Sequence, residues 1–443
     1  MVDLVVRGGM LVDAGQTRPA DLAVDAGRIV AIERDVAIGA IEIDARGLLV
    51  APGLIDVHVH FNAPGHEAWE GAATGSRALA AGGGTLFIDM PLNSTPCTVT
   101  ARDFDLKHAA LAVSSITDFA LWGGLVPGHL ADMDDLADRG VVGFKAFMCY
   151  SGLPEFPRAD DATLLDGMRA AARLGLPVAV HAESHALTEP GRLPPTGSSV
   201  RDFLTSRPVE AEVHAIERAV VIAAETGAML HLVHVSSGRG VAAAAEGRAR
   251  GVDVSIETCP HYLCFTEDDV ERLGAIAKCA PPLRHRDERD ALWSHLVHGE
   301  VDIIASDHSP TEPARKAGDF RTAWGGIAGV QVTLSALLEH GHRRRGLALE
   351  RIIELVCEAP ARRFCLSNKG TLSVGADADL MLIDPGHTIE LSAEHLQQRH
   401  KTSPYVGHTF HGAARRTIRA GETIFVDGRV TARTCGRLVR PRR

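Results

Sequence analysis

The sequence lacks a long apolar segment, a signal peptide, paired cysteine spacing and an excess of positive charge, and each absence excludes a class of protein. Without the first two, neither a membrane-spanning nor an exported protein is expected. Eight cysteines scattered without paired spacing are typical of a reduced protein. The formal net charge is −10 and the basic stretches 343–345 and 437–443 are short, which favours solvated surface over nucleic-acid binding. We therefore expect a soluble, cytoplasmic protein.

The chain does contain many short apolar runs. With 443 residues, 45% of them hydrophobic, it can form more than one domain. Eight runs read as strands buried on both faces of a parallel sheet, namely 54–58, 85–90, 117–122, 141–147, 177–182, 229–235, 252–258 and 301–307. Between them lie stretches with helical spacing of apolar residues, such as 211–226 and 236–250. This alternation predicts an α/β fold, a (β/α)8 TIM barrel over residues 51–368.

The two ends of the chain resemble each other and differ from the middle. Apolar and polar residues alternate over 2–12, 22–24 and 28–32, and again over 370–384 and 417–430. We expect short strands with turns at Asp25-Ala26-Gly27 and Asp427-Gly428. Residues 1–50 and 369–443 should therefore build one small β-sandwich domain together.

Polar residues end or closely follow several of the apolar runs: His58, His60, Lys145, His181, His234 and Asp307. Strand ends of a barrel meet at its C-terminal face, where active sites lie. The alternate positions of His58 and His60 allow both to reach one metal ion, although ordinary strand-end histidines would show the same spacing. Asp307 could bind a metal and accept a proton from water. Together these residues indicate hydrolysis assisted by two metal ions.

Lys145 lies inside an apolar run, where an unpaired ammonium is costly to bury. Burial lowers the pKa of a lysine, and a neutral amine can add carbon dioxide to form a carbamate that bridges two cations. The alternative is a lysine that forms a salt bridge in the barrel mouth. Two more histidines have structural interpretations: His231 as a residue of the core or behind the ligands, and His261 as a neighbour of the ligands.

With these residues assembled, the chain resembles the amidohydrolase superfamily over nearly its whole length. Within it, the chain is similar to the hydrolases of cyclic amides: allantoinase, hydantoinase (dihydropyrimidinase) and dihydroorotase. The resemblance implies two divalent metal ions, expected to be Zn²⁺. It assigns one ion to His58, His60 and Asp307 and the other to His181 and His234, with carboxylated Lys145 as the bridge and a hydroxide between the ions as nucleophile. It also implies that Asp307 is the general base and that the protein is a homotetramer.

Finer motifs bear on the substrate. Asn62 stands where dihydroorotases usually carry an arginine, which a neutral amide cannot replace in binding a carboxylate. The segments 60–65, 69–71, 89–94, 143–148, 278–284 and 324–327 resemble allantoinases, although Ala63 and His66 depart from that pattern. The resemblance therefore implies hydrolysis of the ring amide of (S)-allantoin to allantoate, in purine catabolism. The alternative is a hydantoinase acting on 5-substituted hydantoins.

The substrate would be a small cyclic ureide, and its polar arm needs hydrogen-bonding partners. We expect Asn93, Asn62 and the backbone near Cys279 and Gly325 to supply them, although Asn93 could instead cap a loop. Tyr150 stands where hydantoinases carry a tyrosine that donates to the oxyanion, a contact worth roughly 2–4 kcal/mol; it could equally be a packing residue. A different class of relative, the non-catalytic assembly proteins similar to dihydropyrimidinase, has lost the metal ligands, whereas all six positions are filled here.

Overall fold

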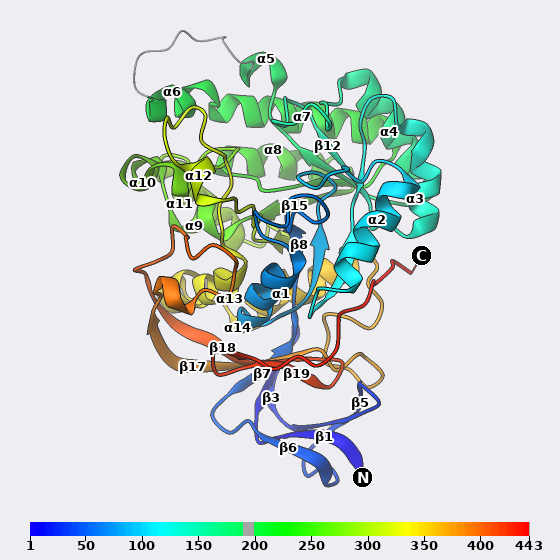
Figure 1. The fold of residues 1–443 in the computed structure, drawn as a ribbon, viewed down its shortest axis with the longest axis vertical. Helices are drawn as coiled ribbons and strands as arrows, with labels where there is room; N and C mark the ends of the chain where they lie inside the picture. Colours follow the sequence, from blue (N-terminus) through cyan, green and yellow to red (C-terminus); the bar gives the residue numbers. More distant parts are fainter. Residues whose placement is uncertain (189–198, 443) are drawn as a thin grey trace.

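A closed barrel of parallel strands forms the centre of the molecule (Figure 1). The structure is a computed structural model that describes residues 1–188 and 199–442. The barrel strands are β8 (Leu54–Val59), β9 (Gly84–Asp89), β10 (Asp118–Leu121) with its continuation β11 (Gly123–Gly124), β12 (Phe144–Phe147), β13 (Val178–His181), β14 (Leu230–Leu232), β15 (Val254–Thr258) and β16 (Ile303–Ile304). The parallel bridge between Val59 and His308 joins the first strand to the segment after the last. The TIM barrel predicted from the alternating runs is confirmed.

Several strands are shorter than the apolar runs that predicted them, and two of them are shortened the most. The run 229–235 forms a strand only over Leu230–Leu232, and the run 301–307 only over Ile303–Ile304. His234 and Asp307 lie just beyond these ends and have φ angles of 40° and 44°. A positive φ is incompatible with an extended strand, so the ladders stop before both residues.

Helices cover the outside of the barrel. The longer ones are α1 (Ala72–Ala81), α2 (Ala101–Ala112), α3 (Met133–Arg139), α4 (Asp161–Leu174), α6 (Ser199–Ser206), α7 (Val209–Thr226), α8 (Gly238–Ala249), α10 (Glu267–Leu273) and α11 (Arg286–Val297). The shorter ones are α5 (His185–Thr188), α9 (Pro260–Cys264), α12 (Pro313–Lys316), α13 (Thr333–Ala336), α14 (Leu349–Ile353) and α15 (Ala359–Arg363), with π-helical turns at Leu337–Arg343 and Glu354–Glu358. The helices expected at 211–226 and 236–250 correspond to α7 and α8. None of the helices in the described ranges combines the length and apolar character needed to cross a membrane.

The alternation of side chains along the strands produces two hydrophobic cores in the barrel. Ile55 and Val57 of β8 pack with Leu86 and Ile88 of β9 in one cluster. Side chains of the outer helices, such as Leu79 and Phe104, belong to the other cluster. Because both faces of the sheet are covered, the strands are mostly apolar, and each polar residue in them needs a specific partner.

Both ends of the chain build a β-sandwich, which lies below the barrel in Figure 1. One sheet has the order β5-β4-β1-β6 and the other β20-β19-β18-β17-β7-β2-β3. The strands are β1 (Val2–Arg7), β2 (Met10–Val12), β3 (Thr17–Pro19), β4 (Asp21–Asp25), β5 (Arg28–Glu33), β6 (Gly39–Asp44), β7 (Leu49–Pro52), β17 (Leu380–Glu390), β18 (Thr409–Arg419), β19 (Glu422–Val426) and β20 (Arg429–Val430). The expected turns join β4 to β5 and β19 to β20, with positive φ at both residues of each turn. The sandwich predicted from both termini is confirmed.

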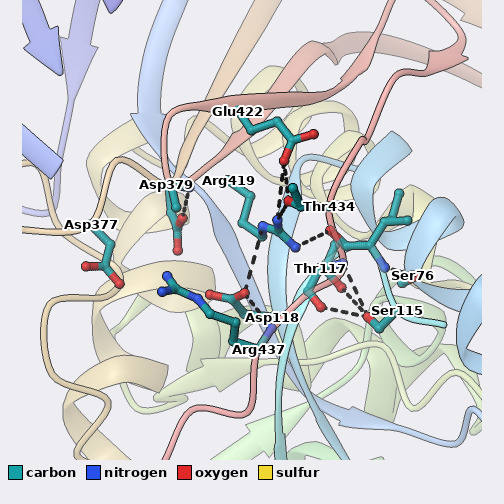
Figure 2. A network of polar contacts seen from close by, with 12 residues as sticks. Ser76, Ser115, Thr117, Asp118, Asp377, Asp379, Arg419, Glu422, Thr434 and Arg437 are labelled. Atoms are coloured by element: carbon teal, nitrogen blue, oxygen red, sulfur yellow. Dashed lines mark hydrogen bonds and ion pairs between the residues drawn. The ribbon is translucent and has the colours of Figure 1, made fainter. Parts of the chain in front are cut away.

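A buried ionic network joins the sandwich to the barrel (Figure 2). Lys369 forms ion pairs with Asp118 at the start of β10 and with Asp377 and Asp379 before β17, at 2.6–3.0 Å. The C-terminal segment then runs along the barrel, where the backbone N–H of Arg437 donates to Asp118 at 3.0 Å. Figure 1 shows this segment passing from the sandwich to the side of the barrel. The basic end of the chain is thus partly engaged in the fold, and Arg443 lies outside the described residues.

Candidate active site

The six residues singled out at strand ends lie together at one rim of the barrel. His58 is in β8 and His60 follows it, Lys145 is in β12, and His181 is the last residue of β13. His234 follows β14 by two residues and Asp307 follows β16 by three. None of the six is more than 9% exposed. The topology therefore brings side chains from five strands into one buried cluster.

The first half of the cluster consists of two imidazoles and a carboxylate. Oδ1 of Asp307 lies 3.3 Å from Nε2 of His58 and 3.4 Å from Nε2 of His60. Burial alone would raise the pKa of Asp307, but the neighbouring histidines lower it to about 2. Burial lowers the pKa of His60 to about 4, so its imidazole is neutral at pH 7. Two imidazoles and one carboxylate at this spacing can hold a divalent cation.

The second half of the cluster is the pair His181 and His234. Their rings are 4.6 Å apart, and the ring of His234 lies 5.3 Å from that of His58 in the first half. Burial lowers the pKa of both histidines, and Nδ1 of His234 has no hydrogen-bond partner. A second cation beside the first fits these neutral imidazoles.

Lys145 is fully buried in the same cluster. Its Nζ has no hydrogen-bond partner among the described residues and lies 5.1 Å from the ring centre of Phe147. Burial lowers its pKa to about 8, and the negative charges of Glu257 and Asp307 only partly offset this effect. An orphaned, easily deprotonated amine between two ligand groups fits the chemistry of a carbamate.

Behind these residues lies Glu257 of β15, which sequence reasoning missed. Its carboxylate accepts from His58 Nδ1 at 2.8 Å, from His231 Nε2 at 3.1 Å and from the backbone N–H of His234 at 3.1 Å. His231 therefore supports the cluster from within the barrel. A signal was available, because a glutamate in an otherwise buried strand needs partners.

Glu183 and Arg207 were missed in the same way. Glu183 is fully buried, and its Oε2 lies 2.7 Å from His181 Nε2 and is also paired with Arg207. Cys149, His181 and Glu183 have side-chain atoms close enough to form a further group of ligand type. The spacing of His181 and Glu183, two residues apart on one extended segment, could have identified Glu183. Nothing local to Arg207 distinguishes it from a surface arginine.

A cavity of about 920 Å³ opens onto the cluster and is lined by five of the six residues, all except Lys145. Four of the expected substrate or catalytic residues also line it: Asn93, Tyr150, Cys279 and Gly325. Tyr150 lines the cavity and is 45% exposed. The cavity is wide enough for a small cyclic substrate.

The two asparagines differ in position. Asn93 lies 3.2 Å from Nδ1 of His60 through its side-chain amide and also faces the cavity. Asn62 is not among the described residues that line the cavity; its amide donates to the carbonyl of Pro310 at 3.4 Å. The structure thus brings Asn93 to the site and places Asn62 behind it, under the segment after the last barrel strand.

Two lysines hold one wall of the cavity. Lys278 Nζ donates to the carbonyls of Phe320 and Ala323, both at 2.7 Å, and Lys316 Nζ donates to that of Gly326 at 2.6 Å. The wall includes Trp324, whose ring packs edge-on against Trp69 at 4.7 Å. The motif around Trp69 therefore serves to support this wall.

The remaining histidines have different surroundings. His261 is buried, has an unpartnered Nε2 and has a pKa lowered to about 4 by burial. His411 Nδ1 lies 2.7 Å from the buried Glu339, far from the cluster in the fold, and His408 packs against Phe265. These contacts indicate that His408 and His411 have structural roles.

Comparisons with known proteins agree with this geometry. The model of the amidohydrolase family matches residues 49–424. The allantoinase of Solibacter usitatus is 60% identical over all of this chain and 98% of that protein, and the allantoinase of Rubrobacter xylanophilus is 54% identical over the same shares. Among solved structures, the L-hydantoinase (dihydropyrimidinase) of Arthrobacter aurescens superimposes with a TM-score of 0.95 at 33% identity, covering 99% of this chain and all of that one.

Proposed function

The chain belongs to the amidohydrolase family and is a hydrolase of cyclic amides, and from this premise we propose that it hydrolyses the ring amide of allantoin to allantoate. One observation carries the proposal: two groups of buried histidines, one of them with Asp307, lie together with Lys145, whose amine has no hydrogen-bond partner among the described residues, and they open onto one cavity. The full-length similarity to allantoinases supports the choice of substrate.

We propose that the cluster holds two divalent cations, Zn²⁺ by ligand type. His58, His60 and Asp307 would hold one and His181 and His234 the other, with carboxylated Lys145 shared between them. When bound, such cations lower the pKa of water toward neutrality and polarise a carbonyl group.

The chain's own residues then have distinct tasks in the reaction. Asp307, ionised at neutral pH, accepts the proton of the attacking water and passes it to the leaving ring nitrogen. Tyr150 donates a hydrogen bond from its hydroxyl to the substrate oxygen that becomes negative, since it is the tyrosine among the described residues that line the cavity. Asn93 and the backbone at Cys279 and Gly325 bind the polar arm of the substrate, and Asn62 supports the site from behind.

The second candidate is a hydantoinase acting on 5-substituted hydantoins. The position of Tyr150 in the cavity and the fold of the Arthrobacter aurescens L-hydantoinase favour this alternative. Against it, the most similar sequences reported above are allantoinases, at 54–60% identity compared with 33% for the hydantoinase.

A single panel of substrates tests the proposal. The purified protein, loaded with zinc, is assayed over a range of concentrations with allantoin, hydantoin, a 5-substituted hydantoin that lacks the ureido arm, dihydrouracil and dihydroorotate. We expect kcat/KM to be highest for allantoin. A higher value for 5-substituted hydantoins would replace the proposal with the second candidate, and a metal content well below two ions per chain with no turnover would make the protein a non-catalytic relative.

We further propose that the enzyme is a cytoplasmic homotetramer. All eight cysteines are free and most are buried, which suits a reducing compartment. Light scattering coupled to size-exclusion chromatography should give about four times the chain mass of 47.1 kDa. A mass of one chain would exclude the tetramer.

A further inference from the structure

The fully buried carboxylate of Glu183 lies between a proposed ligand and an arginine. Its Oε2 accepts from Nε2 of His181 at 2.7 Å, and the guanidinium of Arg207 pairs with the same oxygen. A buried carboxylate without a cation is costly, so the ion pair with Arg207 is what allows Glu183 to remain beside His181. The mechanism proposed above uses His181 but neither Glu183 nor Arg207.

The contact with Glu183 determines which nitrogen of His181 is free. A carboxylate accepts hydrogen bonds and donates none, so the Nε2 facing it carries the proton. The other ring nitrogen, Nδ1, then keeps its lone pair and is the atom that can bind a cation. The orientation of the ring follows from the same hydrogen bond.

Arg207 is itself fixed from the other side. NH1 of Arg284 donates to the backbone carbonyl of Arg207, while Nε of Arg284 donates to Oγ of Ser236 at 2.9 Å. Ser236 lies two residues after His234, the other member of the second cluster. The guanidinium of Arg207 also lies 5.9 Å from the ring centre of Phe203 and lines the cavity. Both the guanidinium and the backbone of Arg207 are therefore fixed by contacts, as a positioning role requires.

We propose that Arg207 is a positioning residue for the second cation site: by anchoring Glu183 it fixes the tautomer and ring orientation of His181. The inference rests on the proposed function for its metal, but its geometric part concerns the metal-free chain alone. Arg207 should therefore affect only the half of the cluster that contains His181. In the described residues, neither Arg207 nor Glu183 is a partner of the other half, which consists of His58, His60 and Asp307.

The first test observes the metal-free protein. Nitrogen-15 NMR of histidine-labelled protein at neutral pH reports the tautomer of each imidazole, and the His181 signal is identified by its loss in His181→Gln. We expect His181 to carry its proton on Nε2 in the wild type and in Arg207→Lys, which keeps the cation. In Arg207→Gln the signal should move to a mixture of tautomers. An unchanged His181 tautomer in a folded Arg207→Gln overturns the proposal.

The second test measures cation affinity. Metal-free protein is titrated with Zn²⁺ in competition with a chromophoric chelator. Because loss of a group behind a ligand typically weakens metal binding by roughly 10- to 100-fold, Arg207→Gln should weaken one of the two sites by about that factor and leave the other within about threefold. Equal weakening of both sites, or of neither, would contradict the proposal.

Matched variants separate positioning from general damage. Arg218→Gln removes an arginine from the ion pair with Asp161 on the outer surface of α7 and should reproduce the wild type in both tests. If Arg207→Gln does not fold, Glu183→Gln replaces it. A neutral amide can both donate and accept, so it no longer fixes the proton of His181 on Nε2. Failure of the wild type to hydrolyse allantoin would refute the proposed function while the tautomer test still decides the role of Arg207.

Discussion

Lys145 is the residue whose surroundings are hardest to explain by packing alone. It has no exposed surface, and no residue in the described part of the chain forms a hydrogen bond with its nitrogen, an arrangement that costs roughly several kcal/mol for a charged amine. By contrast, the similarly buried Lys107 donates to the carbonyl of Met90 at 2.5 Å and pairs with Asp89 at 3.4 Å. The fold thus provides Lys107, which has a structural role, with a hydrogen bond and an ion pair. Lys145 has neither among the described residues, and its amine is available for chemistry.

Substitution of Lys145 by Ala should remove the shared ligand and with it the cations. We expect the metal content to fall below one ion per chain and kcat/KM for allantoin to fall by at least about 100-fold, the upper end of the effect of losing a group behind a ligand. Acetate or propionate, which can occupy the space left by the side chain, should restore part of both. Elemental analysis and steady-state kinetics measure these quantities.

The same acids added to the wild type serve as the control and should not stimulate it. A Lys145→Ala variant with wild-type turnover would eliminate the bridging role. Rescue of the metal content without any rescue of turnover would instead show that the amine's contribution to catalysis is separate from cation binding.

At the scale of elements, the loops after the barrel strands depend on the helices behind them. Helix α2 begins after Thr100, whose side chain accepts from the backbone N–H of Asp103, and Asp103 in turn accepts from the N–H of Thr100. This capping box fixes the start of α2. The same helix contains Lys107, which donates to the carbonyl of Met90 directly after β9. The segment held there leads to Asn93, the neighbour of His60.

Thr100→Ala should therefore destabilise the protein by about 1 kcal/mol, because one N-terminal N–H of the helix loses its acceptor. The free energy of unfolding, measured by urea denaturation, checks this value. Thr100→Ser keeps the hydroxyl and should stay within a few tenths of a kcal/mol of the wild type. Equal losses in both variants would assign the effect to the missing methyl group.

At the scale of the whole molecule, one ionic network joins elements that are far apart in the sequence. Lys369 neutralises carboxylates of the barrel and of the segment entering the sandwich. The backbone N–H of Arg437, in the C-terminal segment, donates to one of them, Asp118 (Figure 2). Lys369, Asp118 and Asp379 are each at most 6% exposed. The position of the sandwich relative to the barrel thus depends on charges that water does not screen.

Lys369→Met should lower the free energy of unfolding at pH 7 by about 3–5 kcal/mol, since it leaves buried carboxylates without a cation. Burial already raises the pKa of Asp379, and loss of Lys369 would raise it further. A carboxyl group with a raised pKa in the folded state is stabilised by protonation, so the deficit should shrink as the pH falls toward 4. Denaturant titrations at several pH values measure this trend.

The control is Arg173→Met, which breaks the pair with Asp134 at the surface, where both side chains are more than half exposed. Its cost should be below about 1 kcal/mol and independent of pH in this range. A similarly small cost for Lys369→Met would mean that the two domains do not depend on the network.

Much of the fold follows from local patterns. Eight apolar runs separated by stretches with helical spacing are enough to predict a barrel. A parallel strand buried on both faces needs apolar residues at nearly every position, so it is visible in the sequence. The turns at Asp25-Ala26-Gly27 and Asp427-Gly428 were predictable for a similar reason, since few residues adopt positive φ. Strand ends were less predictable, because the turns of the backbone at His234 and Asp307 depend on the cluster itself.

What the sequence by itself determined is the set of residues at the barrel rim, from His58 to Asp307, since each is marked by the strand it ends or follows. Only the tertiary structure showed which residues Glu257 and Arg207 support, and it placed Asn62 behind the site instead of in the cavity wall. The physical reason is distance along the chain: Glu257 supports His58 from 199 residues away, and Arg207 supports Glu183 from 24. The local sequence indicates that a buried polar residue needs a hydrogen-bond or ion-pair partner, whereas only the fold determines which distant residue is that partner.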